Sequence, residues 1–173
     1  MDKLIKLLIT LTLTLFAVGC SSTGKIDYMV AGVGTENGNA IWGRSIVFDD
    51  EWGIPSGAIE CCYAQAGGTV SVYDQKFPEK VAVEWLDKSE NRFYFGEVAI
   101  DKNGYRLAKD LPRYTVVSTG RKAKEIIPYL IIGMSETGEI KVWLSNAPSG
   151  RNRVERVLHE LASGQAQWRE NNS

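Results

Sequence analysis

Three thiols and one imidazole are the side chains of this sequence that are best suited to covalent chemistry. Cys61 and Cys62 are adjacent, and His159 is the only histidine. A serine or cysteine nucleophile needs a base, so every such site in this chain would share His159. The sequence also lacks the G-x-S-x-G nucleophile elbow of serine hydrolases. We therefore expect no catalytic residues and no enzyme activity, with His159 in a structural role.

The adjacent thiols Cys61 and Cys62 allow more than one state. Neighbouring residues of a strand point to opposite faces, which favours two separate, buried or half-buried thiols. A bond between neighbours would close a small, strained ring, but a vicinal disulfide stays open in an oxidising compartment. Neither the cysteines nor the acidic run Asp49-Asp50-Glu51 has the ligand spacing of a zinc or calcium site. We expect a possible vicinal thiol pair, no metal and no cofactor.

The N-terminal segment has the layout of an export signal. Lys3 and Lys6 precede an uncharged run from Leu7 to Val18, and the small residue Gly19 follows. A membrane-spanning helix needs about 20 mainly apolar residues, and three threonines interrupt this shorter run. We therefore predict a signal peptide over residues 1–19 rather than a permanent span.

The end of this segment, Ala17-Val18-Gly19-Cys20, resembles the lipobox of bacterial lipoproteins, with Ala17 where leucine is usual. The resemblance implies an acylated Cys20 as the new N-terminus. Two or more acyl chains hold a protein firmly at a bilayer. Ser21 after the cysteine implies sorting to the outer membrane of a Gram-negative cell, facing the periplasm. The alternative is an ordinary signal peptide followed by a free Cys20.

The remaining chain has the size and charge of one neutral domain. Removal of residues 1–19 leaves 18 Lys and Arg against 20 Asp and Glu. So balanced a charge gives no reason to expect nucleic-acid binding. We assign residues 20–27 to a tether and residues 28–173 to a single β-rich domain.

The pattern of short apolar segments separated by turn signals favours strands. We expect a mainly β domain (α+β is the alternative), an antiparallel sheet or sandwich with one or two short helices. The expected strands are 28–33, 41–48, 58–63, 69–73, 80–86, 91–100, 129–134 and 139–144.

Three local predictions go with these strands. The turn Glu36-Asn37-Gly38-Asn39 should pair 28–33 with 41–48 as a hairpin, because Asn-Gly accepts positive φ. Residues 121–127 can form one or two helical turns. The segment 154–161 has apolar residues at helical spacing, yet a strand pairing with the preceding hairpin (129–134 with 139–144) would also suit a β-rich domain, and both alternatives stay open.

Aromatic and basic residues supply the candidates for partner contacts. Trp85 and Trp143 are expected in the core or stacked across a sheet. Trp52 lies in a loop beside Pro55 and three acids, where an exposed aromatic can anchor an interface. Arg151 and Arg153, with Arg156, can face an acidic partner or phospholipid headgroups. We take Trp52, Arg151 and Arg153 as partner-binding candidates.

Several segments together resemble the domain-of-unknown-function 2931 family of bacterial lipoproteins. They are Pro55 to Tyr63, Val83-Glu84-Trp85 before Phe93-Tyr94-Phe95, and Leu130 to Gly133 before Gly138 to Leu144. Tyr63 stands where tryptophan is common. These are packing motifs, and the resemblance implies no catalytic residues. In several genomes the family is similar to immunity lipoproteins encoded beside type VI secretion phospholipase effectors.

The expected function is therefore binding. We expect an outer-membrane lipoprotein that acts as a periplasmic binding module, as in an immunity protein that neutralises a secreted phospholipase toxin. The alternative is an envelope-maintenance or ligand-carrying lipoprotein with no toxin partner. An enzyme that uses His159 or the cysteine pair is a third hypothesis.

Overall fold

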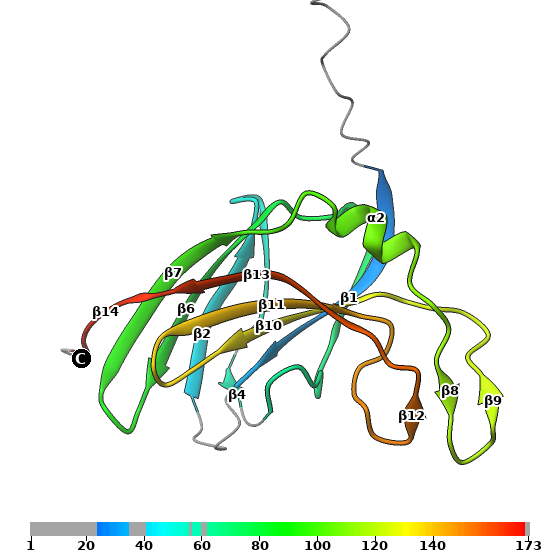
Figure 1. Cartoon of the computed structure of the whole chain (residues 1–173). Coiled ribbons are helices and arrows are strands. Elements are labelled where there is room, and N and C mark those ends of the chain that lie inside the picture. Colours follow the sequence, from blue (N-terminus) through cyan, green and yellow to red (C-terminus); the bar gives the residue numbers. More distant parts are fainter. Residues whose placement is uncertain (1–23, 35–40, 56, 60–61, 172–173) are drawn as a thin grey trace, which may run out of the picture.

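The computed structural model describes residues 24–34, 41–55, 57–59 and 62–171 (Figure 1). These residues form two facing sheets, a small third sheet and one short helix, α2 (Gly104–Lys109). The prediction of a mainly β, sandwich-like domain is confirmed. Within the described ranges, no helix is both long and apolar enough to cross a bilayer.

The first sheet has the strand order β13-β11-β10-β1-β5. The central strand is β10; next to it, β1 runs parallel to β10 and antiparallel to the edge strand β5. The predicted hairpin of 129–134 with 139–144 is confirmed as β10 and β11. The bounds are β1 (Lys25–Val33), β5 (Val70–Lys76), β10 (Tyr129–Met134), β11 (Glu139–Ser145) and β13 (Leu158–Gln165).

The second sheet has the order β14-β7-β6-β2-β3, and β4 pairs with the start of β2. Its middle strand β6 shows the predicted alternation, because Val81, Val83 and Trp85 are all buried. The bounds are β2 (Ile41–Phe48), β3 (Trp52–Ile54), β4 (Ala58–Ile59), β6 (Lys80–Asp87), β7 (Arg92–Ala99) and β14 (Gln167–Glu170).

The two lateral edges of the sandwich differ. At one edge the chain passes from β13 in the first sheet to β14 in the second through Ala166 (Figure 1). The chain crosses close to Gly96 on β7, where a Cβ would lie 2.8 Å from Ile140 Cδ1 and 3.1 Å from the Ala166 Cα. At the other edge, β5 and the short strands β3 and β4 belong to different sheets. The sandwich is therefore closed on one side and open on the other.

The core fills the space between the two sheets. Trp85 is fully buried, stacks on Tyr94 with ring centroids 5.1 Å apart, and donates from Nε1 to the Ser135 carbonyl at 3.0 Å. A second, smaller cluster lies around Trp143, which is 7% exposed, with Tyr63 packed against its ring. Both tryptophans thus take the core positions that were predicted for them.

A third sheet of three very short strands projects beside the sandwich, with the order β12-β8-β9. The strands are β8 (Thr115–Val116), β9 (Arg121–Lys122) and β12 (Arg153–Val154). In Figure 1 this sheet lies at the lower right, whereas β1 begins at the top of the molecule.

The structure corrects several local predictions. β1 and β2 lie in different sheets, so the predicted hairpin between them is wrong; its turn 36–39 lies outside the described residues. The predicted helical turns at 121–127 are wrong, because Arg121–Lys122 is β9 and the helix is α2. The segment 154–161 leads into β13, so the strand alternative holds. Residues 25–27 of the expected tether belong to β1.

Candidate functional site

The small third sheet and its turns concentrate positive charge. We call residues 111–124 and 148–157 the basic arm; it contains seven Lys or Arg residues and one acid, Glu155. The whole chain, by contrast, has a formal net charge of −1. The basic arm lies at the end of the molecule opposite to the first residue of β1 (Figure 1).

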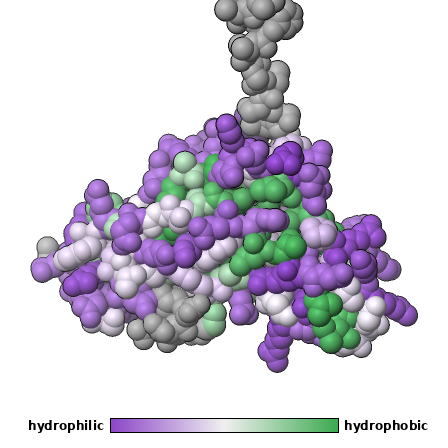
Figure 2. Space-filling view, in the orientation of Figure 1, coloured by the Kyte–Doolittle hydropathy of each residue, from purple (hydrophilic) through white to green (hydrophobic). Residues whose placement is uncertain are grey.

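One face of the basic arm exposes apolar side chains. Val117 is 57% and Val154 is 50% exposed. Val154 pairs with Thr115 of β8, and Val117 follows β8 directly, where its amide donates to the Asn152 carbonyl at 3.1 Å. Figure 2 shows hydrophobic residues on the arm within a hydrophilic surround. The arm thus combines a small apolar centre with a basic rim.

The base of the basic arm is fixed by a buried asparagine. Asn146 is fully buried directly after β11. Its Nδ2 donates to the Pro112 carbonyl at 2.8 Å and to the Glu155 carbonyl at 3.1 Å, and its Oδ1 accepts from the Val157 amide at 2.9 Å. One side chain therefore ties both segments of the arm to the sandwich.

Arg156 completes this base. Its Nε donates to the Ser145 hydroxyl at 3.1 Å and to the Ala147 carbonyl at 3.2 Å, and its guanidinium also donates to the Ala64 carbonyl. Burial, with a smaller contribution from the charge of Arg153, lowers the pKa of Arg156. Arg156 therefore has a structural role. The exposed basic residues of the arm are Arg113, Arg121, Lys122, Lys124 and Arg151.

Two of the predicted contact residues, Arg151 and Arg153, lie together in the basic arm. Arg151 is exposed, whereas Arg153 is half-buried. The Arg153 Nη1 donates to the Arg151 carbonyl at 3.1 Å, and its guanidinium lies 5.4 Å from the ring centroid of Tyr114. Arg153 thus orders the turn that presents Arg151 to solvent.

The third predicted contact residue, Trp52, is not an exposed loop residue. It begins β3, is half-buried, and stacks on Phe48 with ring centroids 4.5 Å apart. It packs against the core and lines a cavity of about 630 Å³ beside Lys25 and Lys80. Trp52 belongs to the second sheet, so the three predicted residues do not form one site.

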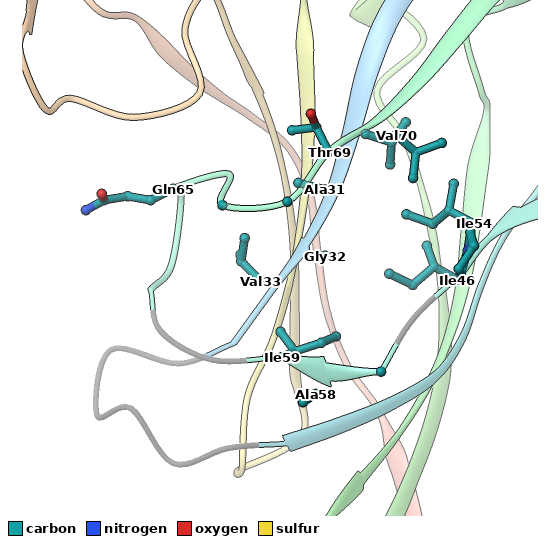
Figure 3. Close-up of a pocket in the computed structure, with 15 residues that line it drawn as sticks. Ala31, Gly32, Val33, Ile46, Ile54, Ala58, Ile59, Gln65, Thr69 and Val70 are labelled. Carbon is teal, nitrogen blue, oxygen red and sulfur yellow. The ribbon is translucent and has the colours of Figure 1, made fainter.

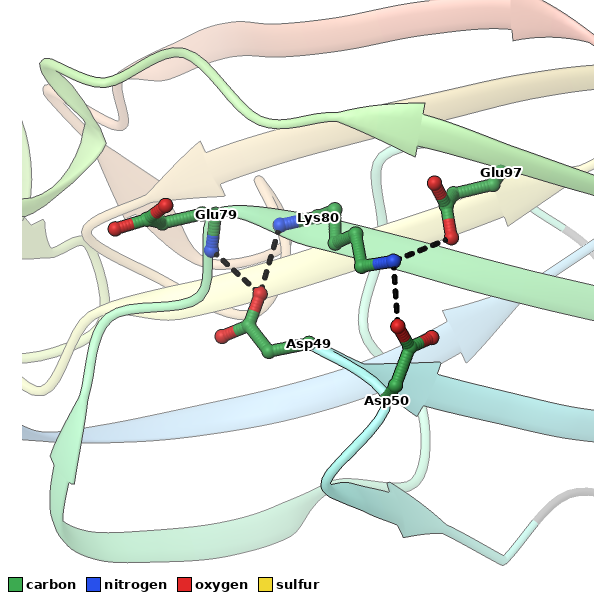
Figure 4. Close-up of polar contacts among 5 residues, drawn as sticks. All are labelled: Asp49, Asp50, Glu79, Lys80 and Glu97. Atoms are coloured by element: carbon green, nitrogen blue, oxygen red, sulfur yellow. Dashed lines mark hydrogen bonds and ion pairs between the residues drawn. The ribbon is translucent and has the colours of Figure 1, made fainter.

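The acidic run beside Trp52 is a structural turn (Figure 4). Asp49 accepts hydrogen bonds from the backbone amides of Glu79 and Lys80, each at 3.0 Å. The Lys80 ammonium pairs with Asp50 at 2.7 Å and with Glu97 at 2.9 Å, and these hydrogen bonds raise the pKa of Lys80. Such exposed pairs contribute little to stability. This cluster fixes the β2–β3 turn to β6.

Of the cysteines and the histidine considered for covalent chemistry, only Cys62 and His159 are among the described residues. Cys20 and Cys61 lie outside the described residues; Cys62 is disulfide-bonded, and its partner also lies outside them. His159 lies half-buried on β13, opposite Leu144 of β11. Among the described residues, no group of three or more His, Cys, Asp or Glu side chains has the arrangement of a metal site.

Sequence reasoning missed an aromatic surface on the outside of the second sheet. Trp42, Leu86, Phe93 and Arg169 follow one another across β2, β6, β7 and β14 in register. The Arg169 guanidinium lies 4.9 Å from the ring centroid of Phe93. Phe93 and Phe95 alternate with the buried Tyr94 along β7, so their rings lie on the outer face of the sheet. This alternation in the sequence could have predicted the surface.

A cavity of about 560 Å³ lies at the open edge of the sandwich, and we call it the open-edge cavity (Figure 3). It lies where the pairing of β1 with β5 ends, at Val30 and Val70. Its walls come from β1, β2, β3, β4 and the chain before β5. The residues that line it are Val30, Ala31, Gly32, Val33, Ile46, Ile54, Pro55, Gly57, Ala58, Ile59, Gln65, Gly67, Gly68, Thr69 and Val70.

Comparison with known proteins identifies a family. The chain belongs to the family described as proteins of unknown function (DUF2931), whose model matches residues 16–172. This confirms the resemblance found in the packing motifs. No curated protein and no solved structure gives a significant match.

Proposed function

We propose that this protein is an outer-membrane lipoprotein, anchored through Cys20, that acts by binding a protein partner with its basic arm. One observation carries the proposal: an apolar centre with a basic rim projects from the sandwich on a base fixed by buried hydrogen bonds. The layout of residues 1–20 and the membership of a family that resembles lipoproteins support the anchor.

The composition and the rigidity of the basic arm both favour a binding role. Exposed apolar side chains surrounded by charged residues are typical of the centre and rim of an interface. Because Asn146 and Arg156 fix the base of the arm, little ordering entropy is lost on binding. The basic rim would speed the encounter with an acidic surface and select for it.

The partner that best fits this surface is a protein with an acidic surface around an apolar patch. The family resemblance suggests a secreted phospholipase, and the arm would cover the mouth of its active site. A lipid anchor raises the concentration of the domain at the membrane where such an enzyme acts. In Figure 1 the arm projects at the lower right, away from the first residue of β1 at the top, which would orient it toward a partner in the periplasm rather than toward the headgroups of its own membrane.

The test is inhibition of phospholipid hydrolysis. The mature lipoprotein is titrated against the secreted phospholipase encoded beside its gene, and the apparent Kd is measured. We expect Arg121→Glu with Arg151→Glu to weaken inhibition at least tenfold, because both charges lie on the exposed rim. The matched control is Arg44→Glu with Arg169→Glu, because both guanidinium groups lie over the Phe93 ring of the aromatic surface. It makes the same change in net charge and should leave inhibition intact.

Three results would contradict this proposal. The first is the absence of a neighbouring phospholipase or of any inhibition. The second is an equal loss of inhibition in both double variants. The third is binding of the basic arm to anionic phospholipid vesicles with no affinity for the enzyme, which would assign the arm to a membrane.

A further inference from the structure

We infer that the cavity beside Trp52 binds a phosphoethanolamine group, in which a phosphate is linked to a primary ammonium. We call it the charged cavity. Its volume of about 630 Å³ falls within the range of about 300–1,000 Å³ that is typical of small-molecule sites. It lies where β1 begins, between the last residues of β5 and the turn from β2 to β3. The site is separate from the basic arm.

The lining of the charged cavity is accessible and balanced in charge. Of its described residues only Phe77 is buried, and the half-buried Trp52 supplies an accessible ring. Three lysines and three acids also line it, namely Lys25, Lys76, Lys80, Asp49, Glu51 and Glu79. A lining with equal numbers of both charges favours a ligand that itself carries both charges.

Two of the lysines form the side that attracts an anion. Lys25 and Lys76 are direct partners in the ladder of β1 with β5, and like charges opposite each other on neighbouring strands repel. Lys25 pairs with Asp74 at 2.9 Å, whereas Lys76 forms no ion pair with any described residue. A phosphate beside the two ammonium groups would offset this repulsion, because its several oxygens can accept from both.

Two of the acids form the side that attracts a cation. Glu51 and Glu79 are exposed, and within the described ranges neither forms an ion pair. In Figure 4 the Glu79 carboxylate extends away from the Lys80 ammonium, which Asp50 and Glu97 already hold. Carboxylates bind a primary ammonium through its N–H donors, whereas a quaternary ammonium has no donor and is held by a cage of aromatic rings. The ligand is therefore a primary amine.

A phospholipid of the anchoring membrane is the nearest source of this group, a step that rests on the proposed anchor at Cys20. Lys25 is five residues from Cys20, and an extended chain spans at most about 3.6 Å per residue, so Lys25 would lie within about 18 Å of the anchor. Tryptophan is also enriched where membrane and water meet, which suits Trp52. A soluble glycerophosphodiester carries the same group, and the experiment separates the two sources.

The experiment titrates the mature protein with glycerophosphoethanolamine and follows the indole signals of isotope-labelled tryptophan by NMR. The Trp52 signal should shift saturably, while the signals of Trp85 and Trp143, which do not line the cavity, stay in place. Glycerophosphocholine and glycerophosphoglycerol should bind about fivefold more weakly, because neither offers an ammonium N–H to Glu51 or Glu79.

Substitutions separate the two sides of the site. Lys76→Gln should weaken the binding of all three phosphodiesters about fivefold. Glu51→Gln with Glu79→Gln should instead remove the preference for ethanolamine without weakening the binding of glycerophosphoglycerol. The matched controls are Lys102→Gln and Glu160→Gln, at exposed positions that do not line the cavity, and both should bind like the unmodified protein. Thermal unfolding establishes that each variant is folded.

A second arm determines the source of the ligand. In nanodiscs that contain phosphatidylethanolamine, a cavity filled from the membrane shows the Trp52 signal at its bound position before any titration. A signal at the free position there, as in phosphatidylcholine nanodiscs, assigns the site to a soluble phosphodiester.

Three results would overturn the inference. They are the absence of a saturable shift at Trp52, equal affinities for the three phosphodiesters, and equal effects of the cavity variants and their controls. The titration in solution does not require the anchor, so it still decides the inference if Cys20 carries no lipid. None of these results affects the test of the basic arm.

Discussion

At the scale of single residues, a few polar side chains decide where surfaces lie. Asn146 connects two segments of chain that are far apart in sequence, and Asp49 fixes a turn to β6. Trp85 and Trp143 could be assigned to the core from the alternation of their strands. Trp52 could not be assigned, because only the tertiary structure places Phe48 and the core beneath it. Arg156 has the same residue type as Arg151, yet burial gives it a structural role.

The first prediction concerns Asn146. Replacement by alanine leaves the Val157 amide and two carbonyls without their buried partner, so Asn146→Ala should lower the free energy of unfolding by about 1–3 kcal/mol. Urea denaturation measures this loss, and hydrogen exchange should become faster in residues 113–122. Gln167→Ala on the exposed strand β14 is the control and should cost less than about 0.5 kcal/mol. Equal losses in both variants would refute the role given to Asn146.

The second prediction concerns alkaline pH. Burial first, and then the neighbouring Glu139, raises the pKa of Tyr63 to about 12, although a hydrogen bond with Ser135 opposes the shift. Since the unfolded state loses this proton near pH 10, the stability from Tyr63 is fully present below pH 10 and is lost as pH rises toward 12. Tyr63→Phe should therefore show a shallower fall in the free energy of unfolding between pH 10 and 11.5. Identical slopes in urea titrations would contradict this.

At the scale of elements, period-two alternation and turn chemistry predicted the strands well and their partners less well. The hairpin of β10 and β11 is local, so a turn of four residues specifies it. β1 instead pairs with β10 and β5, both distant in sequence, and no local signal encodes such pairing. The spacing of Val154, Leu158 and Leu161 is compatible with a helix, but the segment enters strand β13. The free edge of β11 supplies the backbone hydrogen-bond partners for this strand.

The third prediction tests the β10–β11 turn. Gly138 has φ +87°, and a Cβ there would lie 2.6 Å from Gln165 Nε2 and 2.9 Å from the Tyr94 ring. Gly138→Ala combines backbone strain with these clashes and should cost about 2–4 kcal/mol. Gly120 also has positive φ, +62°, but open space around it, so Gly120→Ala should cost only about 1 kcal/mol. Thermal and urea unfolding compare the two, and a larger loss at Gly120 would contradict the packing argument.

At the scale of the whole molecule, the sandwich separates three features. β1 begins at one end, the basic arm projects at the other, and the open-edge cavity lies along one side (Figure 1). The basic arm could be foreseen only in part, from the arginines at 151 and 153. Its other basic residues lie at 113–124, where the sequence predicted only helical turns at 121–127. The two halves of the arm are joined by the pairing of β12 with β8, which are distant in sequence.

The fourth prediction tests the anchor. If residues 1–19 are a lipoprotein signal, the mature chain begins at Cys20 with acyl chains on its sulfur and amine. Mass spectrometry of the purified protein should show this N-terminal peptide, and the protein should fractionate with the outer membrane. Cys20→Ser should release it into the soluble fraction without changing its thermal unfolding. An unacylated, soluble mature chain would contradict the anchoring proposal.

The most direct test of the account is photo-crosslinking in living cells that make the partner. A photoreactive amino acid at Val117 or at Val154 should trap one and the same protein, an acidic secreted phospholipase, because both positions lie on the apolar centre of the basic arm. The same label at Tyr73, which is 68% exposed on β5, should trap nothing. Products that are equally abundant from Tyr73, or none from the arm positions, would contradict the claim that the basic arm is the contact surface.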